Sequence, residues 1–381
     1  MNKNYGLQIV IRDPVVGDIN IDNELQKIID DLHFQKLRYI KQLGFSYLVY
    51  PGANHTRFEH SLGAMQITRE IANNIGLKDI EELECAALLH DIGHCAFSHY
   101  SDQLLKKYLK TDHEKLGKEI IINSSIKDKI QNSTMNYKKV LKYYNGEHKG
   151  AIITGAFGSD RIDYLLRDSY YTGVNYGMID YKSLISNVNI LNNKLVLCSK
   201  GIGIGEHFLL ARYFMYRLVY LHHAIVISEN IYEKAVEWAI MSGKLDANEL
   251  KNLNDYQMLS KLMSINESKI FISKLLTRNL FKRAYDGYIK KRFNLLDIKS
   301  KIKSMGINDS DYVISLLKIK NSDDIAVIDS NNNIINNLSK ISEIVNSLNK
   351  ILIDNQRLII ACDKKDIAKL KGIIPRALQD L

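Results

Sequence analysis

The sequence LLHDIGHCAFSH, residues 88–99, decides how this chain arranges its most informative side chains. The apolar run that leads into it predicts a helix over residues 80–89, which ends at the pair His90 and Asp91. Burying an imidazole and a carboxylate is costly unless both are paired, and one divalent cation would pair them. Neighbouring helical residues point about 100° apart, so such a site needs a helix end or a bend, and Gly93 allows one. Taken alone, the dipeptide fits equally well a polar helix end that capping stabilises.

Histidines are concentrated around this stretch. Of the 11 in the chain, five lie within residues 55–99 and a sixth follows closely, with aspartates among them. A histidine cluster mixed with carboxylates is more typical of a metal or acid–base site than of isolated core histidines. The cluster consists of His55, His60, His90, Asp91, His94, His99, Asp102 and His113.

Two flanking motifs, NHTRFEHSLGAM (54–65) and GSDRIDYLLRD (158–168), give the cluster a family likeness. In this order the motifs resemble the HD superfamily of phosphohydrolases and, within it, the dNTP triphosphohydrolase group. The resemblance extends from about residue 10 to residue 230. Further matching stretches are DPVVGDI (13–19), FQKLRYIKQLG (34–44), HEKLG (113–117), SDRIDYLLRDSYYTG (159–173) and, more loosely, YRLVYLHH (216–223).

The resemblance implies a metal site with four protein ligands. These are His60, His90, Asp91 and Asp160. Two imidazoles and two carboxylates leave positions open for water and substrate, and they suit Mn, Fe, Ni, Zn or Mg. A second ion, Mg, is expected to arrive with the nucleotide.

A second set matches family positions around the scissile phosphate, namely His94, His99, Asp102 and His113. An imidazole that titrates near neutrality can orient the attacking water or protonate the leaving oxygen, and a carboxylate such as Asp102 can hold an imidazole charged. The sequence leaves open which histidine is the acid and which the base. For His99 and His113 the alternative is an ordinary polar residue.

The resemblance also implies a set of substrate-binding residues. Arginines would face the phosphates, and Tyr164 would pack against the deoxyribose, leaving little room for a 2′-hydroxyl, although a core tyrosine is the alternative. Tyr164 and Asp168 share a helical face with Asp160 through i, i+4, i+8 spacing, and Asp168 would receive the sugar hydroxyl. The family's phosphate-gripping arginine appears here as Leu218, a departure from the pattern. The expected substrate-binding residues are Gln42, Leu43, Arg57, Arg161, Tyr164, Asp168 and His222.

The implied reaction is metal-assisted hydrolysis of a dNTP at the α-phosphorus, which yields deoxynucleoside and triphosphate. The alternatives are an HD phosphohydrolase acting on a mono-, di- or cyclic nucleotide and, ranked lower, a nucleic-acid-binding protein or nuclease. The net charge of +9 would suit nucleic acid, but the sequence holds no recognised binding module.

Further partners follow from the resemblance alone. Asp30, Gln35 and Arg38 match residues that read a guanine base at an allosteric nucleotide site, although other positions of that site are here Ile9 and Arg12. The family tends to form dimers or tetramers, so a homo-oligomer is expected.

The expected fold is mainly α-helical, with an HD-domain core over residues 1–245 and a smaller α+β region over 246–381. Helices are predicted at 22–44, 54–75, 80–89, 152–170 and 206–239, and strands within 5–20, 46–52, 193–201, 325–329 and 357–363.

The chain is expected to be cytoplasmic, with no membrane partner. Its four cysteines are scattered without CxxC spacing, and the first residues lack the apolar core of a signal peptide. No apolar run is long enough to span a bilayer.

Overall fold

The structure is a computed structural model that describes residues 9–289, 295–318, 325–354 and 356–371. The chain is mainly α-helical, as predicted. Its contacts fall into two units, which we describe separately. The first contains the described residues of Met1–Met215, Asn248–Tyr256 and Ser322–Asn346, and the second those of Tyr216–Ala247, Gln257–Asn321 and Ser347–Leu381. Because the units are interleaved along the chain, they do not test a single boundary after residue 245.

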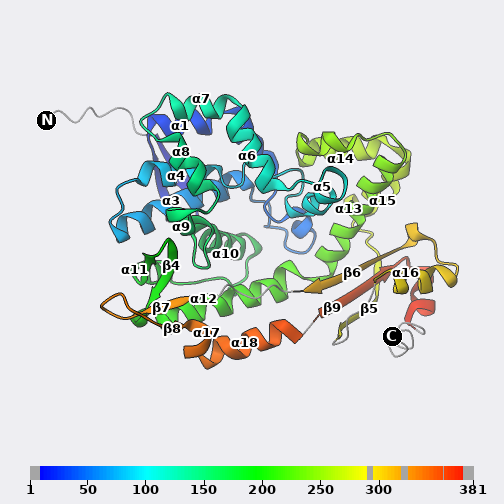
Figure 1. Ribbon diagram of the computed structural model, residues 1–381. Coiled ribbons are helices and arrows are strands. Elements are labelled where there is room, and N and C mark those ends of the chain that lie inside the picture. Colours follow the sequence, from blue (N-terminus) through cyan, green and yellow to red (C-terminus); the bar gives the residue numbers. More distant parts are fainter. Residues whose placement is uncertain (1–8, 290–294, 319–324, 355, 372–381) are drawn as a thin grey trace. The chain divides into compact units, whose positions relative to one another are not determined.

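Three helices of the first unit position the four predicted metal ligands. These are α3 (Arg57–Ile75), α4 (Ile80–Leu89) and α10 (Ser159–Thr172), and α3 packs against both of the others (Figure 1). A capping box fixes the start of α3, where the Thr56 backbone N–H donates to the Glu59 carboxylate at 2.5 Å. The entry to α3 is therefore defined by sequence.

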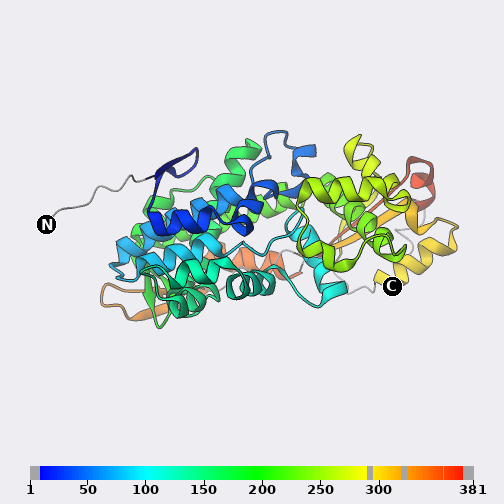
Figure 2. The same cartoon turned by 90° about the horizontal axis from the view of Figure 1, so that it is seen from above.

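The other helices of the first unit surround this core. In Figure 2 the β1–β2 hairpin, in dark blue, leads into α1. The helices and 3-10 turns are α1 Asn23–Ile29, α2 Leu32–Gln35, η1 Lys36–Tyr39, η2 Gly44–Leu48, α5 His99–Leu109, α6 His113–Asn123, α7 Ser125–Gln131, α8 Tyr137–Tyr144, η3 His148–Gly150, α9 Ala151–Thr154, α11 Tyr181–Ser186, η4 Ser199–Gly201, α12 Ile202–Phe214 and α17 Leu338–Ile341.

Two small sheets belong to the first unit. One is the antiparallel hairpin of β1 (Ile9–Asp13) and β2 (Gly17–Ile21). The other has the strand order β3-β4-β7-β8, and its parallel β4–β7 pair joins segments far apart in sequence through Leu197 and Val327. Its strands are β3 Val188–Leu191, β4 Lys194–Cys198, β7 Ala326–Ile328 and β8 Ile334–Asn337.

The second unit contains an antiparallel sheet with the order β5-β9-β6. An apolar cluster that includes Ile298, Ile302 and Leu358 packs α16 against this sheet. The elements are the π-helical segment η5 Met215–Tyr220, whose first residue belongs to the first unit, α13 His223–Met241, α15 Asn266–Leu276, β5 Lys282–Ile289, α16 Leu295–Ser304, η7 Asp309–Asp311, β6 Tyr312–Lys318, β9 Gln356–Cys362 and η8 Lys364–Asp366. The elements η6 Ala247–Lys251, α14 Asp255–Ser264 and α18 Glu343–Asp354 contain residues of both units.

Two of the predicted elements are wrong. Residues 22–44 form α1, α2 and η1 in place of one helix, because the Asp31 side chain caps a new helix by accepting from the His33 backbone N–H at 3.0 Å. Residues 46–52 form the end of a 3-10 turn and a bend, not a strand. Phe45, which directly precedes them, is buried, and its ring stacks on Phe97 with centroids 4.3 Å apart.

Two predicted helices are interrupted. The helix expected over 152–170 is divided into α9 and α10 near Gly158, where a Cβ would lie 2.2 Å from the Ile153 carbonyl oxygen. The helix expected over 206–239 is divided by the π-helical segment. Among the residues described, every helix is too short or too polar to cross a bilayer.

Candidate metal and catalytic site

The four predicted metal ligands converge from three elements. His60 lies in the first turns of α3, His90 and Asp91 directly follow α4, and Asp160 begins α10. His60 Nε2 lies 3.2 Å from His90 Nε2 and 3.5 Å from Asp91 Oδ2. Asp160 Oδ1 lies 3.2 Å from His60 Nε2 and 3.7 Å from His90 Nε2. Donor atoms of His60, His90 and Asp91 therefore all lie within 4.8 Å of one another, and Asp160 Oδ1 lies beside the two histidines.

The outer nitrogens of both histidines fix how the rings face this point. His60 Nδ1 donates to Asp163 Oδ2 at 2.8 Å, and His90 Nδ1 donates to the Ala87 carbonyl oxygen at 2.7 Å. Each ring therefore directs an Nε2 lone pair inward, as metal-binding histidines do. Two lone pairs 3.2 Å apart cannot bond to each other, so the arrangement calls for a positive charge between them.

Electrostatics lead to the same conclusion. Burial favours a lower pKa for His60, but hydrogen bonds to Asp160 and Asp163 and the charge of Asp91 outweigh it and raise the pKa to about 10. A proton on His60 then supplies the positive charge that the neighbouring carboxylates favour. Neutral imidazoles and carboxylates are donors that divalent transition metals and Mg accept, so the residues present fit such an ion.

The residues behind this group are also buried and paired. Arg167, with no exposed surface, donates from Nε and Nη2 to Asp163 at 2.8 and 2.9 Å and from Nη1 to Asp13 at 2.7 Å. Gly63 of α3 leaves room for them, because a Cβ there would lie 1.9 Å from Asp163 Oδ1. The motif residues Asp13, Gly63, Asp163 and Arg167 thus support His60, a role that the sequence prediction missed.

Arg57 neutralises the metal-ligand group from one side. The residue is 3% exposed, and its side chain donates from Nη1 to Asp91 Oδ2 at 2.6 Å and from Nε to Ser98 Oγ at 2.9 Å. Burial favours a higher pKa for Asp91, but the charges of Arg57 and His90 reverse that effect and hold it well below its usual value. Arg57 therefore lies beside the predicted metal as a fixed cation.

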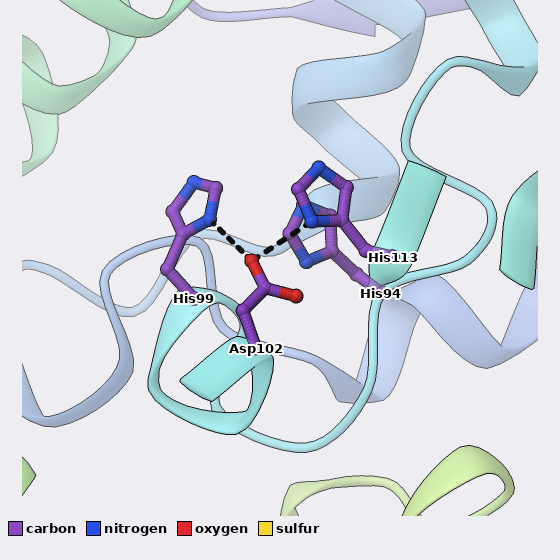
Figure 3. Close-up of side chains that lie close together, drawn as sticks. All are labelled: His94, His99, Asp102 and His113. Carbon is purple, nitrogen blue, oxygen red and sulfur yellow. Dashed lines mark hydrogen bonds and ion pairs between the residues drawn. The ribbon is translucent and has the colours of Figure 1, made fainter. Parts of the chain in front are cut away.

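The second predicted group also assembles (Figure 3). Asp102 Oδ2 accepts hydrogen bonds from His99 Nδ1 at 3.1 Å and from His113 Nδ1 at 2.8 Å. His94 stacks on His113 with ring centroids 4.0 Å apart, and its Nε2 lies 3.4 Å from Asp91 Oδ1. His94 therefore connects the second group to the metal ligands.

Gly93 makes this junction possible. A Cβ at Gly93 would lie 2.0 Å from the carbonyl oxygen of His113 and 2.3 Å from the backbone nitrogen of Gly117, so only glycine lets the loop approach α6 this closely. Phe97 and Ser98 in the same loop have φ of 58° and 56°, a left-handed conformation that non-glycine residues rarely adopt. Strained backbone of this kind is often found at functional sites.

The predicted substrate residues are distributed over several elements. Arg161, Tyr164 and Asp168 lie on α10, and Gln42 and Leu43 directly precede η2. Gln42 is 7% exposed, and its Oε1 is a buried acceptor without a hydrogen-bond partner among the described residues.

His222 belongs to the second unit and to neither group above. There it precedes α13, and its Nδ1 accepts from the Ala224 backbone N–H at 3.3 Å. Leu218 lies in the π-helical segment of that unit.

The residues predicted for an allosteric nucleotide pair with their neighbours. Gln35 Oε1 accepts from Arg38 Nε at 2.8 Å, and Gln35 Nε2 donates to the Ile29 carbonyl oxygen at 2.7 Å. The Arg38 guanidinium lies 3.4 Å above the centroid of the Phe58 ring. Asp30 lies at the end of α1. That Asp30, Gln35 and Arg38 bind an allosteric nucleotide stays a prediction.

Comparison with known proteins shows the family to which this chain belongs. Residues 57–172 match the family model of the HD domain, and residues 179–379 match that of the HD associated region. The chain belongs to the HD-domain superfamily. This confirms the resemblance drawn from the RFEHSLG, HDIGH and SDRIDYLLRD motifs.

Two relatives of this HD-domain chain are longer than it is. It is 40% identical over 278 residues to the uncharacterized protein MJ1154 of Methanocaldococcus jannaschii, a match that covers 72% of this chain and 58% of that protein. It is 29% identical over 341 residues to the deoxynucleoside triphosphate triphosphohydrolase SAMHD1 of Bos taurus, which again covers 72% of this chain and 58% of that protein. The chain thus spans less than two thirds of either relative.

A solved structure resembles the whole of this HD-domain chain. A crystal structure of a phosphohydrolase from Bacteroides thetaiotaomicron has a TM-score of 0.76 at 26% identity. The match covers 94% of this chain and 100% of that one. The mainly α-helical fold with a smaller α+β part is therefore shared over nearly the full length.

Proposed function

We propose that the chain is a divalent-metal-dependent phosphohydrolase that hydrolyses deoxynucleoside triphosphates to deoxynucleoside and triphosphate. The observation that carries this proposal is the convergence of His60, His90, Asp91 and Asp160. The Nε2 atoms of the two histidines lie 3.2 Å apart, and the Nδ1 atoms of both rings already donate hydrogen bonds to other groups. Imidazole lone pairs and carboxylates this close together are stabilised by a cation between them.

A bound divalent cation supplies a lowered pKa for water and polarisation of a phosphoryl oxygen. The identity of the metal, among Mn, Fe, Ni, Zn and Mg, and a second Mg that accompanies the nucleotide stay predictions. Arg57 and Arg161 offset charge that develops on the phosphates, and Arg57 is held in place by Asp91 and Ser98.

The second group is suited to proton transfer. Burial, followed by the charges of Arg57 and His113, keeps the pKa of His94 well below its ordinary value. Burial opposes a higher pKa at His113, but the hydrogen bond to Asp102 prevails and raises it. Two adjacent imidazoles with pKa values displaced in opposite directions fit a base and an acid. We assign the neutral ring of His94 to orienting water and the protonated ring of His113 to the leaving oxygen, with His99 and Asp102 supporting His113.

The order of residues along α10 favours a nucleotide. Asp160 lies in the metal group, and Tyr164 and Asp168 follow on the same face one and two turns later. Eight helical residues rise about 12 Å, enough for a phosphate at one end and a sugar at the other. The triphosphohydrolase activity in the name of the bovine relative supports a dNTP as the substrate.

A phosphohydrolase of another nucleotide is the second candidate. The observation in its favour is Leu218, where the resemblance implies a phosphate-gripping arginine. A homo-oligomer, either a dimer or a tetramer, and an allosteric nucleotide at Asp30, Gln35 and Arg38 are secondary proposals that rest on the resemblance.

Product analysis separates the two candidates. The purified chain, loaded in turn with each candidate metal, is incubated with dGTP, with and without GTP as activator. Inorganic triphosphate and deoxyguanosine support the proposal. Orthophosphate, or hydrolysis of mono-, di- or cyclic nucleotides alone, supports the second candidate.

Variants connect the activity to the site. His90→Ala and Asp91→Asn should reduce triphosphate release to the background of the buffer, together with the metal content of the protein. His207→Ala, which replaces an exposed histidine on α12, is the matched control and should behave as wild type. Activity that survives in both site variants would contradict the proposal.

A further inference from the structure

His55 is a buried histidine outside both groups described above. Its side chain has no exposed surface, and its Nε2 lies 2.7 Å from Asp168 Oδ1, on a carboxylate that is 2% exposed. The two residues are 113 positions apart in sequence. A hydrogen bond between two side chains this deeply buried is strong and specific in geometry, since little water competes for either partner.

Several contacts fix the orientation of the His55 ring. The ring stacks on Tyr171 with centroids 4.6 Å apart and an interplanar angle of 17°. A Cβ at Gly52 would lie 2.5 Å from the Tyr171 carbonyl oxygen, so the loop before His55 approaches the end of α10 closely. The His55 carbonyl oxygen accepts from the Gln42 backbone N–H at 3.0 Å. The ring therefore has one defined position against α10.

The partner of His55 determines its tautomer. A carboxylate oxygen accepts hydrogen bonds, so the Nε2 that faces Asp168 carries the proton. The Nδ1 is buried and has no hydrogen-bond partner among the described residues, which suits a lone pair better than an N–H. His55 therefore acts as a hydrogen-bond donor that holds one carboxylate oxygen of Asp168 in place.

We propose that His55 is a positioning residue that fixes the Asp168 carboxylate for the 3′-hydroxyl of a deoxyribose, and thereby sets selectivity for nucleotides that carry this hydroxyl. The inference rests on the proposed function, which puts the sugar at the Asp168 end of α10, where the resemblance implies that Asp168 accepts a hydrogen bond from the sugar hydroxyl. A site built to bond a substrate hydroxyl discriminates strongly against an analogue that lacks it, but only if its acceptor is held in place.

The test compares dGTP with 2′,3′-dideoxyGTP on the metal-loaded protein. His55→Phe keeps a ring against Tyr171 but removes the donor. We expect its preference for dGTP, measured as the ratio of the two kcat/KM values, to fall by at least about tenfold. The loss should come mainly from a higher KM for dGTP, and kcat/KM for the dideoxynucleotide should change by less than about threefold.

A second pair of variants keeps the test decisive if phenylalanine disturbs folding. The amide nitrogen of His55→Gln reaches about as far as Nε2, whereas that of His55→Asn ends near the Nδ1 position, short of Asp168. Glutamine should restore most of the preference and asparagine should not. Metal content should be the same for both, because neither variant changes a predicted metal ligand.

A double-variant cycle shows whether His55 acts through Asp168. In an Asp168→Asn background, His55→Phe should leave the dGTP preference unchanged, since the group it positions is gone. An effect that persists in that background, or equal losses for both nucleotides with a lower melting temperature, would show a merely structural role and overturn the inference. A wild type that hydrolyses dGTP without preference over the dideoxynucleotide would do the same. If the wild type releases no triphosphate at all, the proposed function fails first and the inference falls with it.

Discussion

The rings of His94 and His113 lie parallel, with an interplanar angle of 12° and centroids 4.0 Å apart, although their pKa values are displaced in opposite directions. His94 is fully buried beside Arg57, and both effects lower its pKa. His113 is bound to Asp102, which raises its pKa against the effect of burial. The fold thus places in contact two imidazoles whose pKa values are displaced to opposite sides of the ordinary value.

This relationship predicts the pH dependence. If His113 is the acid, activity should fall as the pH rises through its raised pKa, because the proton is then lost. Asp102→Asn removes the carboxylate that raises this pKa, so the alkaline limb of the kcat/KM profile should move to lower pH. His113→Ala should lower kcat by about 10²–10⁴-fold. An alkaline limb that does not move in Asp102→Asn would contradict the assignment of His113.

Tyr164 should control discrimination between ribose and deoxyribose. Tyr164→Ala opens space for a 2′-hydroxyl, so the ratio of kcat/KM for GTP to that for dGTP should rise by at least about tenfold. Tyr164→Phe keeps the bulk of the ring and should leave the ratio near that of wild type. If both variants change the ratio equally, the discrimination does not depend on steric exclusion.

Arg57 should be irreplaceable by lysine. It bonds Asp91 and Ser98 at the same time, and a single ammonium cannot reproduce this planar, two-directional geometry. Arg57→Lys and Arg57→Ala should therefore both lower kcat/KM for dGTP by about 10²–10³-fold. Steady-state kinetics at saturating metal provide the measurement. Near-normal activity in Arg57→Lys would contradict this prediction, because it would mean that only the charge of Arg57 matters and not its geometry.

The buried ion pairs of Arg167 with Asp163 and Asp13 should contribute strongly to the stability of the folded protein. Arg167→Met leaves Asp163 and Asp13 buried without their cation, which should cost about 3–5 kcal/mol of folding free energy. Thermal unfolding of the metal-free protein measures this loss of folding free energy. The control is Lys27→Ala, which breaks an exposed pair with Glu24 at 2.9 Å and should change stability by about 0.5 kcal/mol or less. Similar melting temperatures for the two variants would contradict the role given to Arg167.

The sequence predicted well those features that depend on local pattern. The helix at 80–89 and the strands at 193–201, 325–329 and 357–363 lie where periodicity indicates them, and the helix predicted at 54–75 begins three residues later, at Arg57. The apolar run at 46–52 was misassigned, because a short apolar sequence does not distinguish a half-buried turn from a strand.

Predicting the site needed more than local pattern. The motifs indicated which residues to consider, but the contacts that position them join distant parts of the chain. His55 lay within the histidine cluster, yet nothing in its spacing reveals a bond to Asp168. Likewise, Asp163 and Arg167 form an i, i+4 pair that tertiary packing buries completely.

The most direct test of the central claim is a crystal of the protein grown with Mn²⁺ and measured for anomalous scattering. We predict one peak at about 2.0–2.3 Å from His60 Nε2, His90 Nε2 and oxygens of Asp91 and Asp160. The absence of a peak there, with these side chains turned away from one another, would contradict the account.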